Sequence, residues 1–561
     1  MRIRAGIAGI VGLVVALGAT ELVHGLYDLV PSVLGSIAQV VVEWTPGGIV
    51  TQGIELLGKA DIPVLIASVV VGTLVISALL GILAVGRPAL ALLGVALLTA
   101  LGIAVSFVEP FINPVATVVT VVGGLLAGTV VAELMLRAAG LREMKKAPQE
   151  DAAPAGSPGS PDSPVVRWRE AGTGSMSVGR GGFLALGGGA LVAGLAALGL
   201  GRLLSGGSQA ASAPKRLDLS NDGAGKPSGE GNQKDGGGQD PVTHETLPKP
   251  PADASIDAPG MPKIFTPASS FYLIDAALTS PRVNVDDWKL SVKGAVENPV
   301  EFSYKDLQGM STLESDVTLS CVSNPVGGGL VSNGRWTGVL LSDVLKEAGV
   351  SRENISRASQ QLVGRSVDGW TGGFRTDIAL DGREALVAFG LNGSELPVKH
   401  GYPVRLVVPG LYGYVSATKW LSEIELTSWD FDAYWIQRTW TKDGPVKTQS
   451  RLDTVKGGQD LQAGKVPVGG VAWAPHRGID KVEVSTDNGE TWNEARLASQ
   501  LHPDTWRQYV YGWDATPGSY TLQVRATDGE GTLQTPEERP PHGGGGTDGA
   551  QGYHTVEVTV A

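Results

Sequence analysis

Long apolar segments dominate the first 204 residues of the chain. Residues 62–85 contain no charged side chain, and a helix of that length is long enough to span a bilayer. Similar segments lie at residues 5–23, 88–108, 114–132 and 182–204. One such segment could be a buried helix of a soluble protein, but several in succession favour membrane spans. We therefore expect a transmembrane domain of about four spanning helices at residues 1–140 and a fifth at 182–204.

The charges between these segments predict their orientation. Two arginines precede the first helix, and the connection at residues 21–61 carries five acidic side chains against the single Lys59. Basic residues return in alternate connections, at Arg87 and within residues 137–146. Because short basic loops remain in the cytoplasm, five crossings place the N-terminus inside. Everything after residue 204 then lies outside the cytoplasm, and the protein is a multi-pass protein of the cell membrane.

Three segments of this half have a different character. Residues 32–58 are moderately apolar but interrupted at Pro46, so interfacial or re-entrant helices are expected there. Residues 141–181 include a stretch rich in proline, alanine, serine and glycine and would form a cytoplasmic linker. Residues 205–262 combine glycine and charged residues with no aromatic side chain. Such a composition buries too little surface to offset ordering entropy, so a flexible external linker is expected.

After residue 262 the pattern becomes that of a soluble protein. Residues 288–296 and 315–319 alternate like strands, and 340–348 have the period of an amphipathic helix. Buried strands are expected at 385–391 and 403–408, and Asn392 and Gly393 between them predict a tight turn. These elements predict a mixed α/β domain at residues 263–445.

The last part of the chain is β-rich in pattern. Residues 468–473, 479–485 and 520–526 alternate or form apolar runs, with turn residues between them. Short strands at this spacing predict an immunoglobulin-like β-sandwich at residues 446–561. The multi-domain fold class is thus a transmembrane helical bundle, a mixed α/β domain and this sandwich.

Composition narrows the chemistry. The chain has 561 residues and a formal net charge of −12, without a basic face, which argues against nucleic acid as a partner. No haem-attachment motif, iron–sulfur cysteine set or glycine-rich nucleotide loop occurs in the sequence, and His24 is the only histidine in the apolar half. Cys321 is the only cysteine, so it forms no intramolecular disulfide. It is either an inert core residue or a thiolate with a chemical role.

The surroundings of Cys321 favour the chemical role. The relevant motifs, in order, are SCVSN at 320–324, NGRWTGVLLSDVL at 333–345, LVAFGLNGSELP at 386–397, HGYPVRLVVPG at 400–410 and KWL at 419–421. This ordered series resembles the sulfite oxidase family of molybdopterin enzymes, from about residue 264 to the C-terminus. The family's fold is a molybdopterin domain followed by an immunoglobulin-like dimerisation domain, and the resemblance therefore implies a possible homodimer.

The resemblance also implies roles for individual residues. Cys321 corresponds to the thiolate that binds molybdenum, a soft ligand suited to a sulfur-coordinated metal. His400 and Arg405 correspond to residues that hold the pterin phosphate, and a guanidinium can pair with two phosphate oxygens. Further cofactor contacts are implied for Tyr272, Ser366, Thr418 and Lys419. The implied cofactor is molybdenum–molybdopterin.

Three departures from the family concern the substrate. Sulfite-oxidising members have an arginine where this chain has Asp275 and a tyrosine where it has Phe374, and their arginine pair is replaced by residues 325–327. We therefore take Asp275 and Phe374, with Cys321, as the catalytic candidates. Because an aspartate beside the metal would repel an anion, we expect a substrate other than sulfite.

The leading hypothesis is a membrane-anchored molybdopterin oxidoreductase that transfers an oxygen atom to or from a small molecule outside the cytoplasm. Since the sequence contains no other redox centre, a separate haem or quinone-linked partner is expected. One alternative is a sulfoxide-type reductase fed by a membrane electron donor. Another is a non-enzymatic, membrane-anchored binding module.

Overall fold

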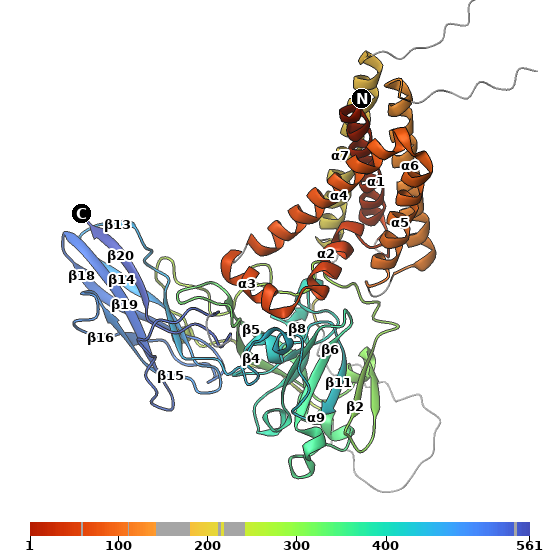
Figure 1. Ribbon diagram of the computed structural model, residues 1–561. Coiled ribbons are helices and arrows are strands. Elements are labelled where there is room, and N and C mark those ends of the chain that lie inside the picture. Colours follow the sequence, from red (N-terminus) through yellow and green to blue (C-terminus); the bar gives the residue numbers. More distant parts are fainter. Residues whose placement is uncertain are drawn as a thin grey trace, which may run out of the picture. The chain divides into compact units, whose positions relative to one another are not determined.

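The computed structural model describes residues 1–27, 29–57, 60–109, 112–141, 180–210, 215–217, 242–542 and 547–561 (Figure 1). Most of the linker predicted at 141–181, and part of that predicted at 205–262, lie outside these ranges. The chain forms two compact units. We call residues 1–41 and 62–210 the helical unit, and residues 42–61 and 211–561 the β-rich unit.

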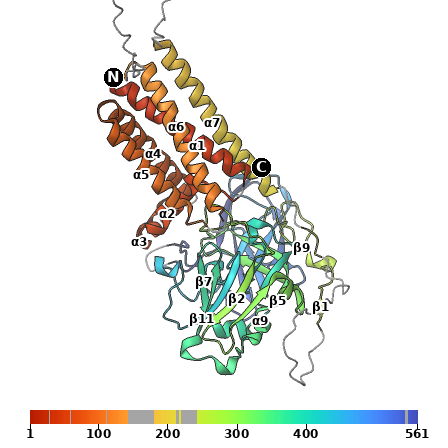
Figure 2. The same ribbon diagram turned by 90° about the vertical axis from the view of Figure 1, so that its right-hand side faces the viewer.

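The helical unit contains the long apolar segments as helices that run side by side (Figure 2). Its long helices are α1 (Arg2–Leu26), α4 (Asp61–Gly86), α5 (Pro88–Ser106), α6 (Pro114–Ala138) and α7 (Arg180–Ala210). Helix α6 begins with a proline at its first position, and the Asn113 side chain accepts a hydrogen bond from the amide of Ala116 at 3.0 Å. Among the described residues, five helices are long and apolar enough to cross a membrane.

Helix α1 packs against its neighbours through glycines. A Cβ atom at Gly18 would lie 2.4 Å from the carbonyl oxygen of Gly194 in α7. At Gly12 it would lie 2.6 Å from the carbonyl oxygen of Gly128 in α6. These distances leave no room for a side chain, and such close backbone approach is typical of helices that associate in lipid.

Two shorter helices follow α1 in the chain. They are α2 (Val33–Trp44) and α3 (Gly47–Leu57). The break between them falls at Pro46, where the proline ring disfavours a helical conformation of the preceding Thr45. The interruption expected within residues 32–58 is therefore present as a helix break.

Two sheets form the first domain of the β-rich unit. One has the strand order β1-β4-β5-β8-β10, with β9 on β8, and the other β3-β2-β11-β6-β7. The first comprises β1 (His244–Glu245), β4 (Thr312–Ser320), β5 (Val331–Leu340), β8 (Leu386–Leu391), β9 (Ser394–Glu395) and β10 (Arg405–Val407). The second comprises β2 (Lys289–Gly294), β3 (Val300–Ser303), β6 (Gln361–Ser366), β7 (Thr371–Arg375) and β11 (Leu421–Thr427). The helices are α8 (Tyr304–Gln308), α9 (Leu341–Glu347) and α10 (Gly413–Ser416).

The sequence pattern accounts for these strands. All six residues of β8 are buried, which fits a strand covered on both faces and a continuous apolar run. Asn392 and Gly393 both have positive φ and make the tight turn from β8 to β9. Thus the turn expected after the first buried strand leads into a short hairpin before β10.

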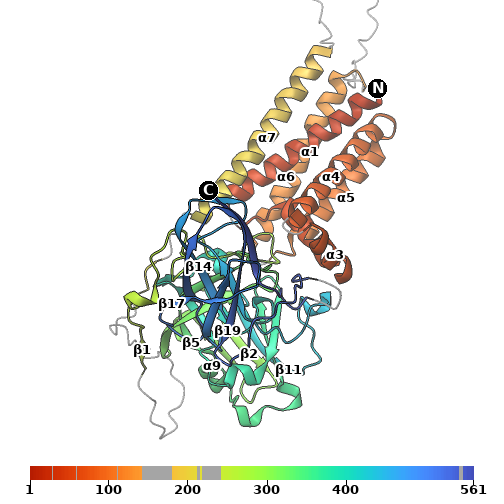
Figure 3. The same cartoon turned by 90° about the vertical axis from the view of Figure 1, so that its left-hand side faces the viewer.

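The second domain is a sandwich of two sheets, some of whose strands are labelled in Figure 3. One sheet has the order β12-β14-β18-β17, and the other β13-β20-β19-β15-β16. Their bounds are β12 (Gln449–Leu452), β13 (Gln459–Leu461), β14 (Gly464–Trp473), β15 (Ile479–Ser485), β16 (Asn493–Glu494), β17 (Arg496–Leu497), β18 (Arg507–Ala515), β19 (Gly518–Asp528) and β20 (His554–Val560). Inward-facing Val468, Val484 and Tyr509 are fully buried between the sheets. The architecture is immunoglobulin-like.

Residues 242–262 differ from the flexible linker expected over 205–262. Strand β1 pairs in parallel with β4, and His244 Nδ1 lies 2.8 Å from Thr312 Oγ1. Ile256 is buried, and its amide donates to Gln508 Oε1 at 2.6 Å. Backbone pairing with a sheet edge and with the sandwich offsets the ordering entropy that the composition alone could not.

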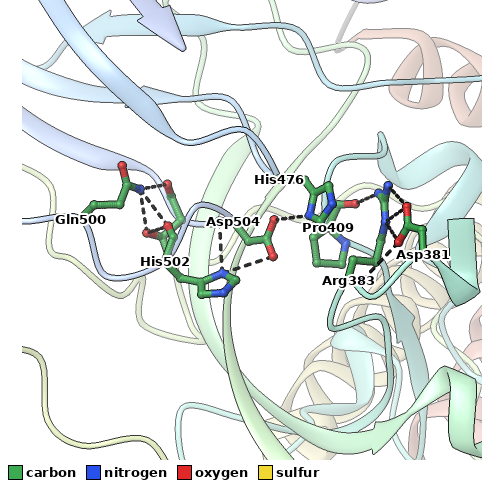
Figure 4. Close-up of polar contacts among 8 residues, drawn as sticks. Asp381, Arg383, Pro409, His476, Gln500, His502 and Asp504 are labelled. Carbon is green, nitrogen blue, oxygen red and sulfur yellow. Dashed lines mark hydrogen bonds and ion pairs between the residues drawn. The ribbon is translucent and has the colours of Figure 1, made fainter. Parts of the chain in front are cut away.

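The two domains of the β-rich unit meet at a buried carboxylate (Figure 4). Asp504 is 1% exposed and lies 3.4 Å from His476 Nδ1 and 3.3 Å from His502 Nδ1. Its backbone carbonyl accepts a hydrogen bond from the amide of Thr318 in β4 at 2.9 Å. The hydrogen bond to Asp504 raises the pKa of His502. Burial alone would raise the pKa of Asp504, but the two histidines lower it overall.

This arrangement predicts a pH-dependent contribution to stability. The contribution of His502 is complete below its unfolded-state pKa of about 6.5 and is lost as the pH rises through the higher folded-state pKa. That of Asp504 is complete above about 3.9 and is lost as the pH falls through its lowered pKa. His502→Gln should therefore cost about 0.5–1 kcal/mol at pH 5.5, a modest figure because the histidine is partly exposed, and less at pH 8.5. Thermal unfolding midpoints of the full chain at both pH values measure this difference.

Ser450→Ala is the control, because the Ser450 hydroxyl contacts Gln534 and a backbone carbonyl and no titratable group. Its effect should not change between the two pH values. An effect of His502→Gln that is equally large at pH 5.5 and 8.5 would contradict the assignment.

Candidate active site

Cys321 is the first residue after β4 and opens a loop, residues 321–330, which we call the cysteine loop. The Cys321 amide donates to the carbonyl of Leu330 at 2.9 Å and so closes the loop. Inside it, Asn324 Oδ1 accepts from the amide of Leu330 at 2.7 Å. The thiol is 8% exposed and lines a cavity. The loop is thus held by its own backbone with the thiol facing that space.

The cavity has the size of a ligand site, with about 800 Å³ of empty volume, part of it open to solvent. Residues from several parts of the sequence line it. They include Phe271, Tyr272, Asp275, Cys321, Ser366, Asp368, Trp370, Arg405, Tyr414, Lys419, Trp435 and Trp440. Six of the sequence-predicted site residues therefore meet here: Tyr272, Asp275, Cys321, Ser366, Arg405 and Lys419.

The environment of Cys321 favours the protonated thiol in the protein without a metal. Burial raises the pKa of Cys321, although hydrogen bonds at Ser323 and the charge of Lys419 act in the opposite direction. A metal ion would replace that proton, since it is the thiolate that binds metals. In the described part of the chain, no cluster of three His, Cys, Asp or Glu side chains could hold a metal by itself. A metal at Cys321 would accordingly need ligands from a cofactor.

Arg405 provides the test of whether a phosphorylated cofactor fits this cavity. The residue is 4% exposed, and its guanidinium donates to the backbone carbonyls of His400, Leu406 and Ala417 at 3.2–3.5 Å. No described carboxylate lies within ion-pair distance of it. Burial lowers the pKa of Arg405 to about 10, so it is still a cation at neutral pH. A buried cation with long, neutral hydrogen bonds fits an anionic group such as a phosphate.

Lys419, the second cation of the cavity, is already paired. Its Nζ forms an ion pair with Asp275 Oδ1 and donates to the carbonyl of Lys399 at 3.2 Å. Burial raises the pKa of Asp275 and lowers that of Lys419, while the ion pair acts in the opposite sense on each. The aspartate that sequence comparison placed beside the metal therefore has its charge balanced by the lysine.

Three predicted residues lie outside the lining of this cavity. His400 is buried and donates from Nε2 to the carbonyl of Ala268 at 2.9 Å, because a carbonyl can only accept. Burial lowers the pKa of His400 to about 4, so the ring is neutral. Thr418 is buried, and its carbonyl accepts from the amide of Leu406. Phe374 lies in the hydrophobic core of the domain.

An aromatic wall of the cavity was not anticipated from the sequence. The rings of Trp435 and Trp440 stack with centroids 4.1 Å apart, and Tyr414 meets Trp440 edge-on at 5.3 Å. Trp370 also lines the cavity. The density of aromatic residues at 429–440 was the available signal, since unusual aromatic clusters are typical of binding sites as well as cores.

Comparison with known proteins agrees with this geometry. Residues 277–435 match the oxidoreductase molybdopterin binding domain, and residues 445–534 match the Mo-co oxidoreductase dimerisation domain. The first match contains Cys321, Arg405 and Lys419 and so indicates an oxidoreductase molybdopterin binding domain around the cavity. Through these two domains the chain resembles the sulfite oxidase family, and molybdenum–molybdopterin is the implied cofactor.

Each of the following relatives aligns with less than half of this chain. Mitochondrial sulfite oxidase of Rattus norvegicus is 30% identical over 264 residues, 40% of this chain and 48% of the relative. The Homo sapiens enzyme is 28% identical over 299 residues, which are 46% of this chain and 54% of that enzyme. Nitrate reductase [NAD(P)H] of Hordeum vulgare is 27% identical over 279 residues, which are 41% of this chain and 31% of that enzyme. The chain thus spans about half the length of the two sulfite oxidases.

Among solved structures, the sulfane dehydrogenase SoxCD from Paracoccus pantotrophus aligns over 54% of this chain and 82% of that chain. Its TM-score is 0.45 and its sequence identity 23%.

The buried ion pair gives a stability prediction. Lys419→Met leaves the Asp275 carboxylate buried without its cation, so the free energy of unfolding should fall by about 3 kcal/mol. Replacing both partners, as Lys419→Met with Asp275→Leu, should recover most of this loss. Urea unfolding of the cofactor-free full chain measures both effects.

Lys465→Met serves as the control, because Lys465 pairs with Asp514 on the surface, with both side chains largely exposed. It should change stability by less than about 1 kcal/mol. Equal losses in the single and double variants at the cavity would mean that the ion pair is not the relevant interaction.

Proposed function

We propose that this protein is a membrane-anchored molybdopterin oxidoreductase that exchanges an oxygen atom with a small substrate other than sulfite, outside the cytoplasm. The observation that carries the proposal is one cavity lined by the Cys321 thiol, by the buried Arg405 and by the Lys419–Asp275 ion pair. The thiol and Arg405 suit the cofactor, and the Lys419–Asp275 ion pair affects which substrate can bind.

The chain's own residues hold the cofactor. Cys321, once deprotonated, would supply a thiolate ligand to molybdenum. Arg405 would pair with the pterin phosphate, and Tyr272 and Ser366 would contact the remainder. His400 supports the site indirectly. Its hydrogen bond to the Ala268 carbonyl connects the segment before Tyr272 to the turn that precedes Arg405. Thr418 fixes the backbone of Leu406, the neighbour of Arg405.

When bound, the cofactor supplies two-electron oxygen-atom exchange between water and substrate. In the oxidising direction a substrate X and water give XO, two protons and two electrons. Since the described cavity offers no second redox group, a separate haem or quinone-linked partner would accept the electrons. The five apolar helices and the basic residues between them support a location of this partner at the membrane.

Charge at the cavity argues against sulfite. An oxyanion needs cations or hydrogen-bond donors next to the metal. Arg405 is assigned to the phosphate, and Lys419 is neutralised by Asp275. Asp368 adds a further carboxylate to the lining. The anion would therefore be desolvated in this cavity without a free cation to compensate.

A sulfoxide-type reductase is the second candidate. It uses the same exchange in reverse, so that XO, two protons and two electrons give X and water, with electrons from a membrane donor. The aromatic wall of Trp370, Tyr414, Trp435 and Trp440 favours it, because such surfaces suit uncharged organic groups. The match to a dimerisation domain supports a homodimer for either direction.

Metal content and sulfite turnover test the proposal together. The full chain, matured in a host that makes the cofactor, should contain about one molybdenum and one pterin per chain. Its sulfite-dependent reduction of ferricyanide should not exceed that of cofactor-free protein. Asp275→Asn should increase the rate at subsaturating sulfite at least tenfold, because it frees Lys419 to bind the anion.

Asp381→Asn is the control, since Asp381 pairs with Arg383 away from the cavity. Enzyme-like sulfite turnover by the wild type would refute the substrate exclusion. Correctly matured chain without molybdenum would refute the oxidoreductase and favour a binding module.

A further inference from the structure

The cysteine loop is held by contacts from the C-terminal domain as well as by its own hydrogen bonds. It contains three consecutive glycines, Gly327 to Gly329, and therefore has little intrinsic stiffness. Arg451 in β12 of the sandwich donates from Nη1 to the carbonyl of Gly328 at 2.8 Å. The contact comes from the C-terminal domain and reaches the loop that presents the cavity thiol.

Arg451 is itself fixed in place. Its Nε pairs with Asp453 Oδ1 at 2.8 Å, and both side chains are largely buried. Its backbone carbonyl accepts a hydrogen bond from the Tyr509 hydroxyl at 2.8 Å. The guanidinium therefore reaches Gly328 from a preorganised position, which reduces the entropy lost on forming the contact.

His554 in β20 contacts the loop next to Arg451. Its Nδ1 accepts a hydrogen bond from the amide of Leu452 at 2.9 Å, so the opposite edge of the ring faces Gly327. A Cβ atom at Gly327 would lie 2.1 Å from His554 Cδ2. Gly327 also has φ +72°, a left-handed conformation that favours glycine. The loop and the ring thus fit each other only with glycine at this position.

The strand before the loop is fixed by the same domain. The amide of Trp506 donates to Thr318 Oγ1 at 2.7 Å, and the amide of Thr318 donates to the Asp504 carbonyl at 2.9 Å. The sandwich therefore holds the chain three residues before Cys321 and again six and seven residues after it.

We propose that Arg451 and His554 are positioning residues for Cys321, and that the C-terminal domain has the second role of bracing the metal-binding loop. This role rests on the proposed function of Cys321 as a metal ligand. The alternative is that both residues stabilise the sandwich alone, with no effect on the thiol beyond that of general stability.

The single cysteine makes the test direct, since each chain carries one thiol. A chromogenic disulfide reagent is added to the full chain purified without cofactor, and the rate of Cys321 labelling is measured. Gly327→Ala and Arg451→Gln should each raise the rate roughly tenfold by opening the loop locally. Arg451→Lys, which retains a cationic donor, should restore a rate nearer to that of the wild type.

Two matched controls separate bracing from general stability. Gly329→Ala adds the same methyl group to the same loop where nothing lies within 4 Å, and Arg525→Gln removes an ion-paired arginine elsewhere in the sandwich. Neither should change the labelling rate. His554→Ala combined with Gly327→Ala should partly relieve the clash and slow the labelling relative to Gly327→Ala.

Labelling rates that follow only the global free energy of unfolding, or that rise equally in the controls, would overturn the positioning role. Because labelling needs no metal, its outcome is separable from that of the proposed function. Faster labelling in the Arg451 and Gly327 variants, with a wild type that never binds molybdenum, would leave the brace standing and refute the ligand role. Unchanged labelling together with normal molybdenum content would refute the brace and leave the proposed function standing.

Discussion

The candidate site depends on how strand β4 ends. Eight residues of β4, up to Ser320, pair with β5, so the strand is fixed in register to its last position. Cys321 is the first residue released from that ladder, and its amide turns back to Leu330. A one-residue slip of β4 would carry the thiol to the other face of the sheet. The sandwich contacts at Thr318 and at the cysteine loop further restrain this strand and the loop that follows it.

The charges of the cavity are arranged around this fixed thiol. Arg405 is buried with carbonyls and the Trp336 ring as its protein partners, and none of these neutralises its charge as an anion would. Lys419 and Asp275 form a pair that leaves neither charge free for a substrate. The arrangement separates two tasks. One cation is available to an anionic cofactor, while the space toward the aromatic wall offers little to an anionic substrate.

Local signals in the sequence were sufficient for many helices and strands, and its motifs were sufficient for the cofactor class. Apolar segments, period-two alternation and the Asn392–Gly393 turn are local signals, and the corresponding helices and strands are present. The motifs around Cys321 and Arg405 led to a cofactor class that the family matches support. Each of those motifs is short and continuous in the sequence, so their residues and spacing are enough to indicate the cofactor class.

Other features could not be predicted because they depend on contacts between distant residues. The pairing of Asp275 with Lys419, and the fit of His554 against Gly327, join segments far apart in the chain. The position of Phe374 in the core also follows from how β7 lies in its sheet. Residues 242–262 have the composition of a linker, yet β1 gains a partner in β4 that composition does not reveal.

The central claim is that Cys321 binds the metal. X-ray absorption at the molybdenum edge, on wild-type and Cys321→Ser protein, tests it most directly by counting the sulfur neighbours of the metal. The variant should show one sulfur neighbour fewer, with the pterin retained through Arg405 and its neighbours. The same number of sulfur neighbours in both proteins would contradict it.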